Sequence, residues 1–150
     1  MGSESDCSHG LAIALADESG KKRWSDAVTA CSGKTAVKGG TWRLPSLNDW
    51  EHMFIGCGGS GSFNDSPPKV SYSGLADKLN TAAGVGAAMY TGEGDSYYWS
   101  SSVTGTNEGV VYYGLLWFGS SSDSSGNNAV LFGSQDDKLV TRYVRACLAF

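Results

Sequence analysis

The last eight residues, Tyr143-Val144-Arg145-Ala146-Cys147-Leu148-Ala149-Phe150, decide the fold. Every second residue in this stretch is apolar, starting from Val144, and this period of two is typical of a β-strand. A strand at the end of a chain leaves backbone groups unpaired unless another strand covers its edge. Residues 9–16 alternate in the same way, with Leu11, Ile13 and Leu15 on one face. We therefore expect the N-terminal strand to pair with the C-terminal strand.

Two helices are predicted between these strands. Trp24, Val28 and Cys31 recur at helical spacing, and Gly33 ends this first helix. Ser46 can cap a second helix. The buried stripe of that helix is expected to consist of Leu47, Trp50, Phe54 and Cys57. A third, weaker helical segment is predicted over residues 75–82.

The second half of the chain has a different character. No Lys or Arg occurs between residues 79 and 137, while Tyr, Trp, Ser, Gly and Asn are interleaved there. Short strands joined by turns are expected, two of them over residues 110–118 and 129–132. The sequence thus predicts one domain over residues 9–150 that contains helices and several short strands, preceded by a tail over residues 1–8.

Composition narrows the range of functions. The 150 residues carry 11 Lys and Arg against 15 Asp and Glu, so the formal net charge is −4. Nucleic-acid binding draws its affinity from many cationic contacts to phosphates, so we do not expect nucleic acid as a partner. The longest apolar runs are much shorter than the roughly 20 residues that cross a bilayer, so no membrane insertion is expected.

Motifs for catalysis or metal binding are weak. Residues 56–61 match G-x-G-x-x-G, but they follow a predicted helix, whereas a dinucleotide-binding loop follows a strand. Residues 123–128 could offer oxygen atoms to calcium, yet they lack the acidic spacing of a calcium loop. Glu93, Asp95 and Glu108 could in principle supply the two carboxylates of a glycan-cleaving enzyme. We expect no enzyme activity, no metal and no cofactor.

Four cysteines, at positions 7, 31, 57 and 147, leave the disulfide question open. They contain no C-x-x-C pair, so a zinc ribbon or a thioredoxin-like motif is not indicated. Two disulfides could form in any of three pairings.

The mixture of aromatic and small polar residues after Tyr97 indicates recognition. Tyr and Trp offer large, rigid contact areas, while Ser, Gly and Asn supply adaptable hydrogen bonds, as in antibody binding sites. Alternation along strands requires that some of these rings be buried. Leu139 and Val140, between two charged residues, are also expected to be presented at the surface.

Three stretches together resemble one family. They are residues 40–46 (GTWRLPS), residues 98–102 (YWSSS) and residues 143–150 (YVRACLAF). This order is similar to C-type lectin-like domains of the formylglycine-generating-enzyme-like branch, and in particular to variable proteins of diversity-generating retroelements. The resemblance implies an α+β, C-type lectin-like fold, in which two helices flank a small, mostly antiparallel sheet and the terminal strands pair. It also implies a display segment over residues 103–142, and that Cys31 could pair with Cys147.

The resemblance implies a function as well. It indicates a non-enzymatic, receptor- or adhesin-type domain at a cell surface or on a virion, which binds a protein or another cell-surface ligand. The alternative is a structural subunit of a surface fibre or virion without a ligand of its own. The expected contact residues are Thr104, Thr106, Asn107, Tyr112, Tyr113, Trp117, Asp123, Asn127, Asn128, Gln135, Asp136, Leu139 and Thr141.

Overall fold

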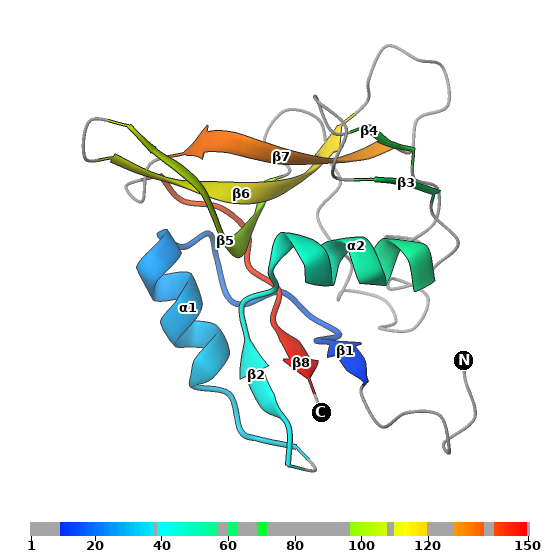
Figure 1. The fold of residues 1–150 in the computed structure, drawn as a ribbon. Helices are drawn as coiled ribbons and strands as arrows, with labels where there is room; N and C mark the ends of the chain where they lie inside the picture. Colours follow the sequence, from blue (N-terminus) through cyan, green and yellow to red (C-terminus); the bar gives the residue numbers. More distant parts are fainter. Residues whose placement is uncertain are drawn as a thin grey trace.

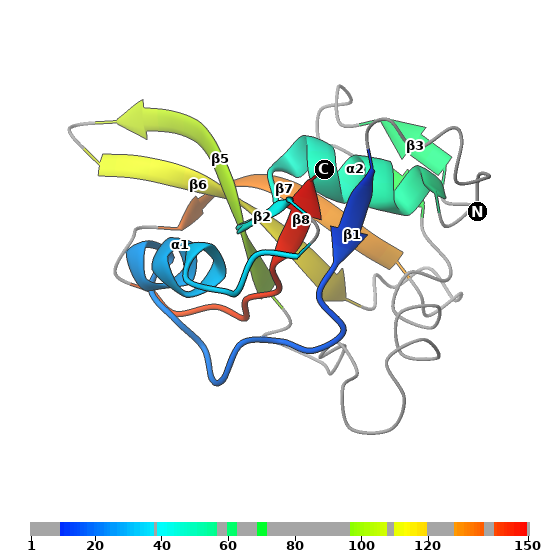
Figure 2. The ribbon, with the colours of Figure 1, turned by 90° about the horizontal axis from the view of Figure 1, so that it is seen from below.

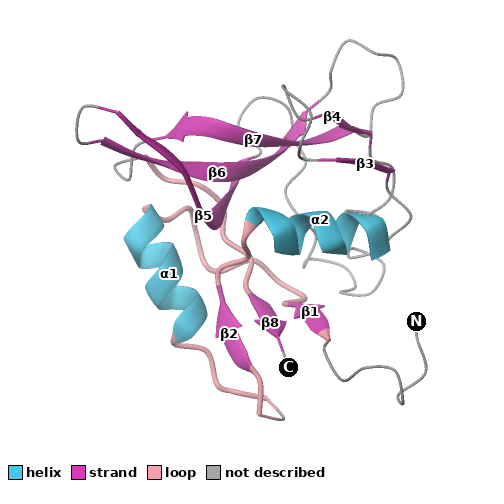
Figure 3. Cartoon of the chain, viewed as in Figure 1, coloured by secondary structure: helices cyan, strands magenta, loops and turns pink. Residues whose placement is uncertain are grey.

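A computed structural model gives the fold (Figure 1). It describes residues 10–37, 39–56, 60–62, 69–71, 97–107, 110–119, 128–136 and 140–149, and side chains at 10–37, 39–53, 97–103 and 140–148. The described part is α+β, with helices α1 (Trp24–Ser32) and α2 (Leu47–Gly56) and antiparallel sheets (Figure 3). Neither described helix has the length and apolar character that a membrane span requires.

The two ends of the chain share one sheet. Strands β1 (Leu11–Ile13) and β2 (Thr41–Arg43) lie on either side of β8 (Cys147–Ala149), and both run antiparallel to it. Figure 2 shows β8 between them. The predicted pairing of the terminal strands is therefore confirmed.

Both terminal strands are shorter than predicted. After Ile13 the chain leaves the regular ladder, so that Ala14 becomes buried while Leu15 is 55% exposed. Leu15 therefore does not continue the alternation of β1. Val144 and Ala146 each accept one backbone hydrogen bond from the N-terminal region instead. Glu18 N donates to Val144 O, and Ala14 N donates to Ala146 O, each at 2.9 Å.

A second, longer sheet contains β5 (Tyr97–Asn107), β6 (Val110–Gly119) and β7 (Asn128–Asp136) in the order β5-β6-β7. The strands predicted over residues 110–118 and 129–132 are confirmed as parts of β6 and β7. In Figure 1 this sheet crosses the top of the view and the terminal sheet lies below it, with α1 and α2 to either side. Two short strands, β3 (Ser60–Ser62) and β4 (Lys69–Ser71), pair with each other. The helical segment predicted over residues 75–82 lies outside the described residues.

Both predicted helices are present. In α1, Ala27 and Cys31 are buried, and the N–H of Gly33 closes the last turn on Thr29 O at 2.9 Å. In α2, Trp50 is fully buried, whereas Leu47 is only half-buried. The side chains predicted at positions 54 and 57 lie outside the described set.

Ser46 and Asp49 cap α2 reciprocally. Asp49 N donates to Ser46 Oγ at 3.1 Å, and Ser46 N donates to Asp49 Oδ2 at 2.7 Å. The same carboxylate accepts hydrogen bonds from the guanidinium of Arg43, which ties α2 to β2. The predicted role of Ser46 is confirmed, with an added link from the helix start to the terminal sheet.

A buried core lies between these elements. It consists of Ala14, Ala27, Cys31, Leu44, Trp99, Val144 and Ala146. These residues come from the N-terminal strand region, α1, the β2–α2 connection, β5 and the C-terminal segment. The core therefore joins parts of the chain that are more than 100 residues apart, since Ala14 and Val144 belong to the same cluster.

The Asp49 cap predicts a pH dependence of stability. Burial raises the pKa of Asp49, but hydrogen bonds from Arg43 and Ser46 outweigh it and hold the pKa below its ordinary 3.8. The cap therefore stabilises the fold above pH 3.8, and this contribution is lost as the pH falls through the lower, folded-state pKa. We expect Asp49→Asn to lower the free energy of unfolding by about 1–2 kcal/mol at neutral pH.

Urea unfolding at a series of pH values would measure this effect. The difference between the original chain and Asp49→Asn should shrink on acidification. A difference that stays constant down to acid pH would show that the carboxylate charge is not what stabilises the cap.

Candidate functional site

The candidate site begins where β5 leaves the core. Tyr98, Trp99 and Ser100 are fully buried, whereas Val103 is 57% exposed. Three consecutive buried residues in one strand require that both faces of the strand be covered, because successive side chains point to opposite faces. We call residues 97–102 the anchor, and residues 10–53 with 143–148 the scaffold.

The indole of Trp99 ties the anchor to the scaffold. Its Nε1 donates to Lys22 O at 2.7 Å, and its backbone N donates to Tyr143 O at 3.1 Å. Tyr143 N in turn donates to Tyr97 O at 2.9 Å. The C-terminal segment therefore runs parallel to the anchor, and the backbone N–H and C=O of Tyr143 bond to it on either side of Tyr98.

The serines of the anchor connect it to both helices. Ser100 O accepts a hydrogen bond from Trp24 Nε1 at 2.9 Å, at the start of α1. Ser102 Oγ accepts one from Leu47 N at 3.0 Å, in the first turn of α2. Ser101 N donates to Pro45 O at 2.8 Å. Small polar side chains are needed here because the two helix starts approach the strand backbone directly.

A buried ion pair fixes the other face of the anchor. Arg145 is fully buried, and its Nε donates to Asp17 Oδ1 at 2.6 Å. The second carboxylate oxygen of Asp17 accepts the hydroxyl of Tyr98 at 2.7 Å. Arg145 also donates to Leu15 O at 3.2 Å. Burial raises the pKa of Asp17, and the hydrogen bond from Tyr98 and the charge of Arg145 act against it.

This cluster is the part of the site that sequence reasoning missed. In the alternation of the last strand Arg145 falls on the face opposite Val144 and Ala146, yet the structure buries it. One signal was available: Arg145 is the only charged residue among the last eight. A lone charge in an apolar strand requires a partner, and a buried guanidinium is found almost only with a carboxylate.

Beyond the anchor, β5 continues into the display segment as an irregular sheet. The β5–β6 register shifts between Trp99 and Val103 and again between Val103 and Gly105, and the β6–β7 register shifts between Tyr113 and Gly114. Such bulges bend a strand and re-aim its side chains, and they are common beside functional sites.

The register places most expected contact residues on three adjacent strands. Thr104, Thr106 and Asn107 lie in β5, and Tyr112, Tyr113 and Trp117 lie in β6, with Asn128, Gln135 and Asp136 in β7. Tyr113 is paired with Val103 on one side and with Asp136 on the other. Trp117 is paired with Tyr97 and with Val130, in the row that continues from the anchor.

Four expected contact residues fall outside these three strands' described ranges. Thr141 is exposed, beside the point where the chain re-enters the scaffold. Val140 is partly buried and packs against the core. Asp123, Asn127 and Leu139 lie outside the described residues, as do Glu93, Asp95, Glu108 and the loop over residues 123–127 that could offer oxygen atoms to calcium.

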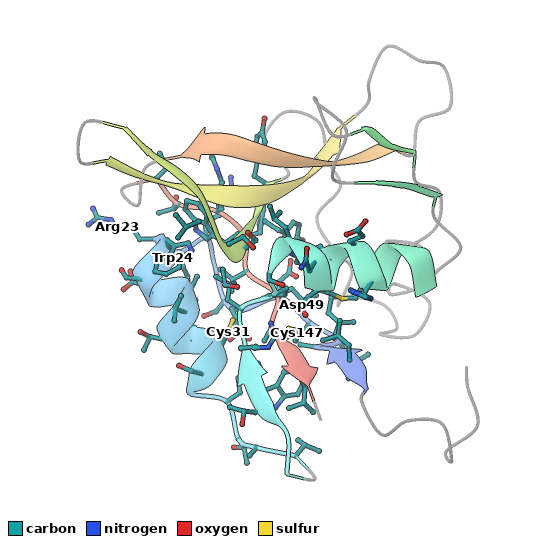
Figure 4. The ribbon with its side chains drawn as sticks, viewed as in Figure 1. Arg23, Trp24, Cys31, Asp49 and Cys147 are labelled. Carbon is teal, nitrogen blue, oxygen red and sulfur yellow. The ribbon has the colours of Figure 1, made fainter. Side chains whose placement is uncertain are left out.

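Cys31 and Cys147 are buried and are both free thiols in this structure. They come from α1 and β8, and Figure 4 shows both in the region between these elements. Burial raises the pKa of each thiol to about 12. The disulfide that the family resemblance implies is therefore not formed in this structure. Cys7 and Cys57 lie outside the described residues.

Within the ranges that the structure describes, no group of three or more His, Cys, Asp or Glu side chains could hold a metal ion. His52 is exposed on α2, and Glu18 forms an ion pair with Lys34 at 2.6 Å.

Comparisons with known proteins add nothing to this geometry: no family model, no curated protein and no solved structure matches the chain. The resemblance to variable C-type lectin-like proteins therefore stays a prediction from sequence.

The buried ion pair predicts a large effect of a single substitution. Asp17→Ala would leave the buried charge of Arg145 without its carboxylate, at a cost of about 3–5 kcal/mol in the free energy of unfolding. Asp26→Ala, at an exposed position of α1, is the matched control and should change it little. Chemical denaturation of both variants measures this, and equal effects would contradict the importance of the ion pair.

The thiols predict a reactivity pattern. At pH 8, about four units below their pKa of about 12, Cys31 and Cys147 are almost entirely protonated and are also shielded from reagent. We expect both to resist iodoacetamide in the folded protein and to react in urea, as peptide mapping by mass spectrometry would show. Rapid alkylation of either residue in the folded protein would contradict the buried core.

Proposed function

We propose that this protein is a non-enzymatic binding domain with a C-type lectin-like fold, similar to the variable proteins of diversity-generating retroelements. In this proposal the display segment, residues 103–142, contacts a macromolecular partner, which we take to be a protein. The scaffold holds both ends of that segment. By the same resemblance, the protein acts at a cell surface or on a virion.

One observation carries the proposal: the display segment starts and ends at neighbouring points of the buried scaffold. The anchor precedes it, Tyr143 follows it, and Tyr98 and Tyr143 are partners in a parallel bridge. Tyr97 O and Trp99 N both bond to Tyr143, which closes the segment at its base. Substitutions inside such a closed segment need not disturb the core that positions it.

The composition of the segment favours a protein partner. Its aromatic residues suit an interface whose affinity rests on a few large side chains, for which we propose Tyr112, Tyr113 and Trp117. Its lack of Lys and Arg before residue 138 disfavours a polyanion. The segment spans 40 residues, and a typical interface needs about 20–30 residues from each partner.

The proposal is tested by substituting the segment without knowing its partner. We would randomise the expected contact residues of β5, β6 and β7 in a surface-display library. The library would then be selected for binding to a purified protein that the original chain does not bind. We expect most variants to unfold cooperatively near the original midpoint, and we expect specific binders to be recovered. A library that is mostly unfolded would contradict the proposal.

The three aromatic residues proposed to dominate the affinity predict that binding and stability can be separated. Replacing Tyr112, Tyr113 and Trp117 together with Ala should abolish capture of the natural partner and leave the thermal midpoint nearly unchanged. Partner capture by pull-down and calorimetry on the same preparations measure the two effects. A large fall in the midpoint would show that these residues belong to a core, and undiminished capture would place the contact elsewhere.

A further inference from the structure

Among the buried side-chain polar groups that the structure describes, the indole N–H of Trp50 is the one without a hydrogen-bond partner. Trp50 lies in the first turn of α2, and its side chain is fully buried. A buried donor without an acceptor lowers stability, because it gives up its hydrogen bond to water and gains none in return. Such a group in a folded protein therefore requires an explanation.

The other tryptophans whose side chains are described all donate their Nε1–H to a backbone carbonyl. The N–O distances are 2.9 Å for Trp24, 3.0 Å for Trp42 and 2.7 Å for Trp99. Trp50 departs from this pattern, although phenylalanine could fill a buried aromatic position without an unbonded N–H. Its indole therefore indicates an acceptor that the described residues do not supply.

Trp50 meets the anchor together with the residue one turn before it. Leu47 and Trp50 are three residues apart, so they lie on one face of α2. Leu47 N donates to Ser102 Oγ at 3.0 Å, and the Trp50 ring lies edge-on to the Tyr98 ring, with 6.3 Å between the centroids. Figure 1 shows the start of α2 beside β5. The start of α2 therefore covers the part of β5 that runs from Tyr98 to Ser102.

Two serine hydroxyls lie in this contact between helix and strand. Ser100 is fully buried, and its Oγ accepts a hydrogen bond from Ser102 N at 3.2 Å. Ser102 Oγ accepts the bond from Leu47 N. A hydroxyl has one hydrogen to donate and two lone pairs. In the described hydrogen bonds, each of these hydroxyls uses one lone pair and keeps its hydrogen and the other lone pair.

We propose that one water molecule is bound between the start of α2 and the anchor. It accepts the indole N–H of Trp50 and forms hydrogen bonds with the hydroxyls of Ser100 and Ser102. Buried waters in proteins typically make about three hydrogen bonds to polar groups that are otherwise unsatisfied, which is the set of groups found here. The inference does not rest on the proposed function, because the three residues belong to the scaffold and the anchor.

Water explains the contact better than the neighbouring ring does. The π face of Tyr98 could accept the indole N–H, but such a bond is weaker than one to oxygen, and it would leave both serine hydroxyls as they are. A bridging water is nearly as favourable as a direct hydrogen bond, and it satisfies the indole and the hydroxyls together. The site would thus attach α2 to the anchor at a second point, beside the bond from Leu47 to Ser102.

NMR on the ¹⁵N-labelled protein tests the inference. The Hε1 signal of Trp50 is assigned by its loss in Trp50→Phe, and NOE and ROE spectra then record its cross-peaks to water. A water molecule that stays bound while the protein tumbles gives NOE and ROE cross-peaks of opposite sign. We expect this pair of cross-peaks for Trp50 Hε1. Trp99 Hε1 is the matched control, because its indole is also fully buried but donates to Lys22 O, and we expect no such pair for it.

A serine hydroxyl bonded directly to the indole could give a similar cross-peak, because hydroxyl hydrogens exchange with water. Ser100→Ala and Ser102→Ala, made separately, distinguish the two arrangements. A bound water keeps two of its three partners in either variant, so the cross-peaks should persist in both. Their loss in either variant would overturn the inference.

Two results in the original chain would also overturn it. They are the absence of the cross-peaks for Trp50 Hε1, and a strong upfield shift of this hydrogen, which would place it over an aromatic ring. The test remains decisive if Trp50→Phe does not fold, because NOEs within the indole ring assign Hε1 in the original chain.

Discussion

Burial of the anchor is the constraint on which the rest of the structure depends. Tyr98, Trp99 and Ser100 are fully buried in one strand, so scaffold elements must cover both of its faces. One side is covered by Trp24, Lys22 and the start of α1, and the other by the ion pair of Asp17 and Arg145. Removing a buried ring of this size typically costs about 3–5 kcal/mol, which is a large part of the stability of a domain of this length.

The anchor also explains why the two termini must pair. Tyr143 bonds to the backbone of residues 97 and 99, and Arg145 reaches back to Asp17 and Leu15. The C-terminal segment therefore joins the N-terminal strand region to β5, and β8 completes the connection as the central strand between β1 and β2. What lies between the anchor and Tyr143 is held at its base, which is the geometry that a display function requires.

Periodicity predicted the elements better than their surroundings. The spacing of Trp24, Val28 and Cys31 predicted α1, Ser46 predicted the start of α2, and alternation predicted the pairing of β1 with β8. The alternation could not show that Leu15 is exposed, because β1 ends at Ile13 and the chain leaves the ladder there. It could not show that Arg145 is buried either, since its carboxylate partner is 128 residues away in the sequence. The bridge between Lys22 and Arg142 was invisible for the same reason: only the fold brings these residues together.

Native-state hydrogen exchange at the backbone amides of Trp99, Ser101 and Tyr143 tests the account most directly. These three N–H groups bond to Tyr143, Pro45 and Tyr97, at the junction between the anchor and the scaffold. The account predicts that these amides exchange only through global unfolding. It also predicts equally slow exchange in a chain in which the expected contact residues of β5, β6 and β7 are all replaced by Ser. Fast local exchange at these amides in the original chain, or loss of protection in the substituted chain, would contradict an independently stable scaffold.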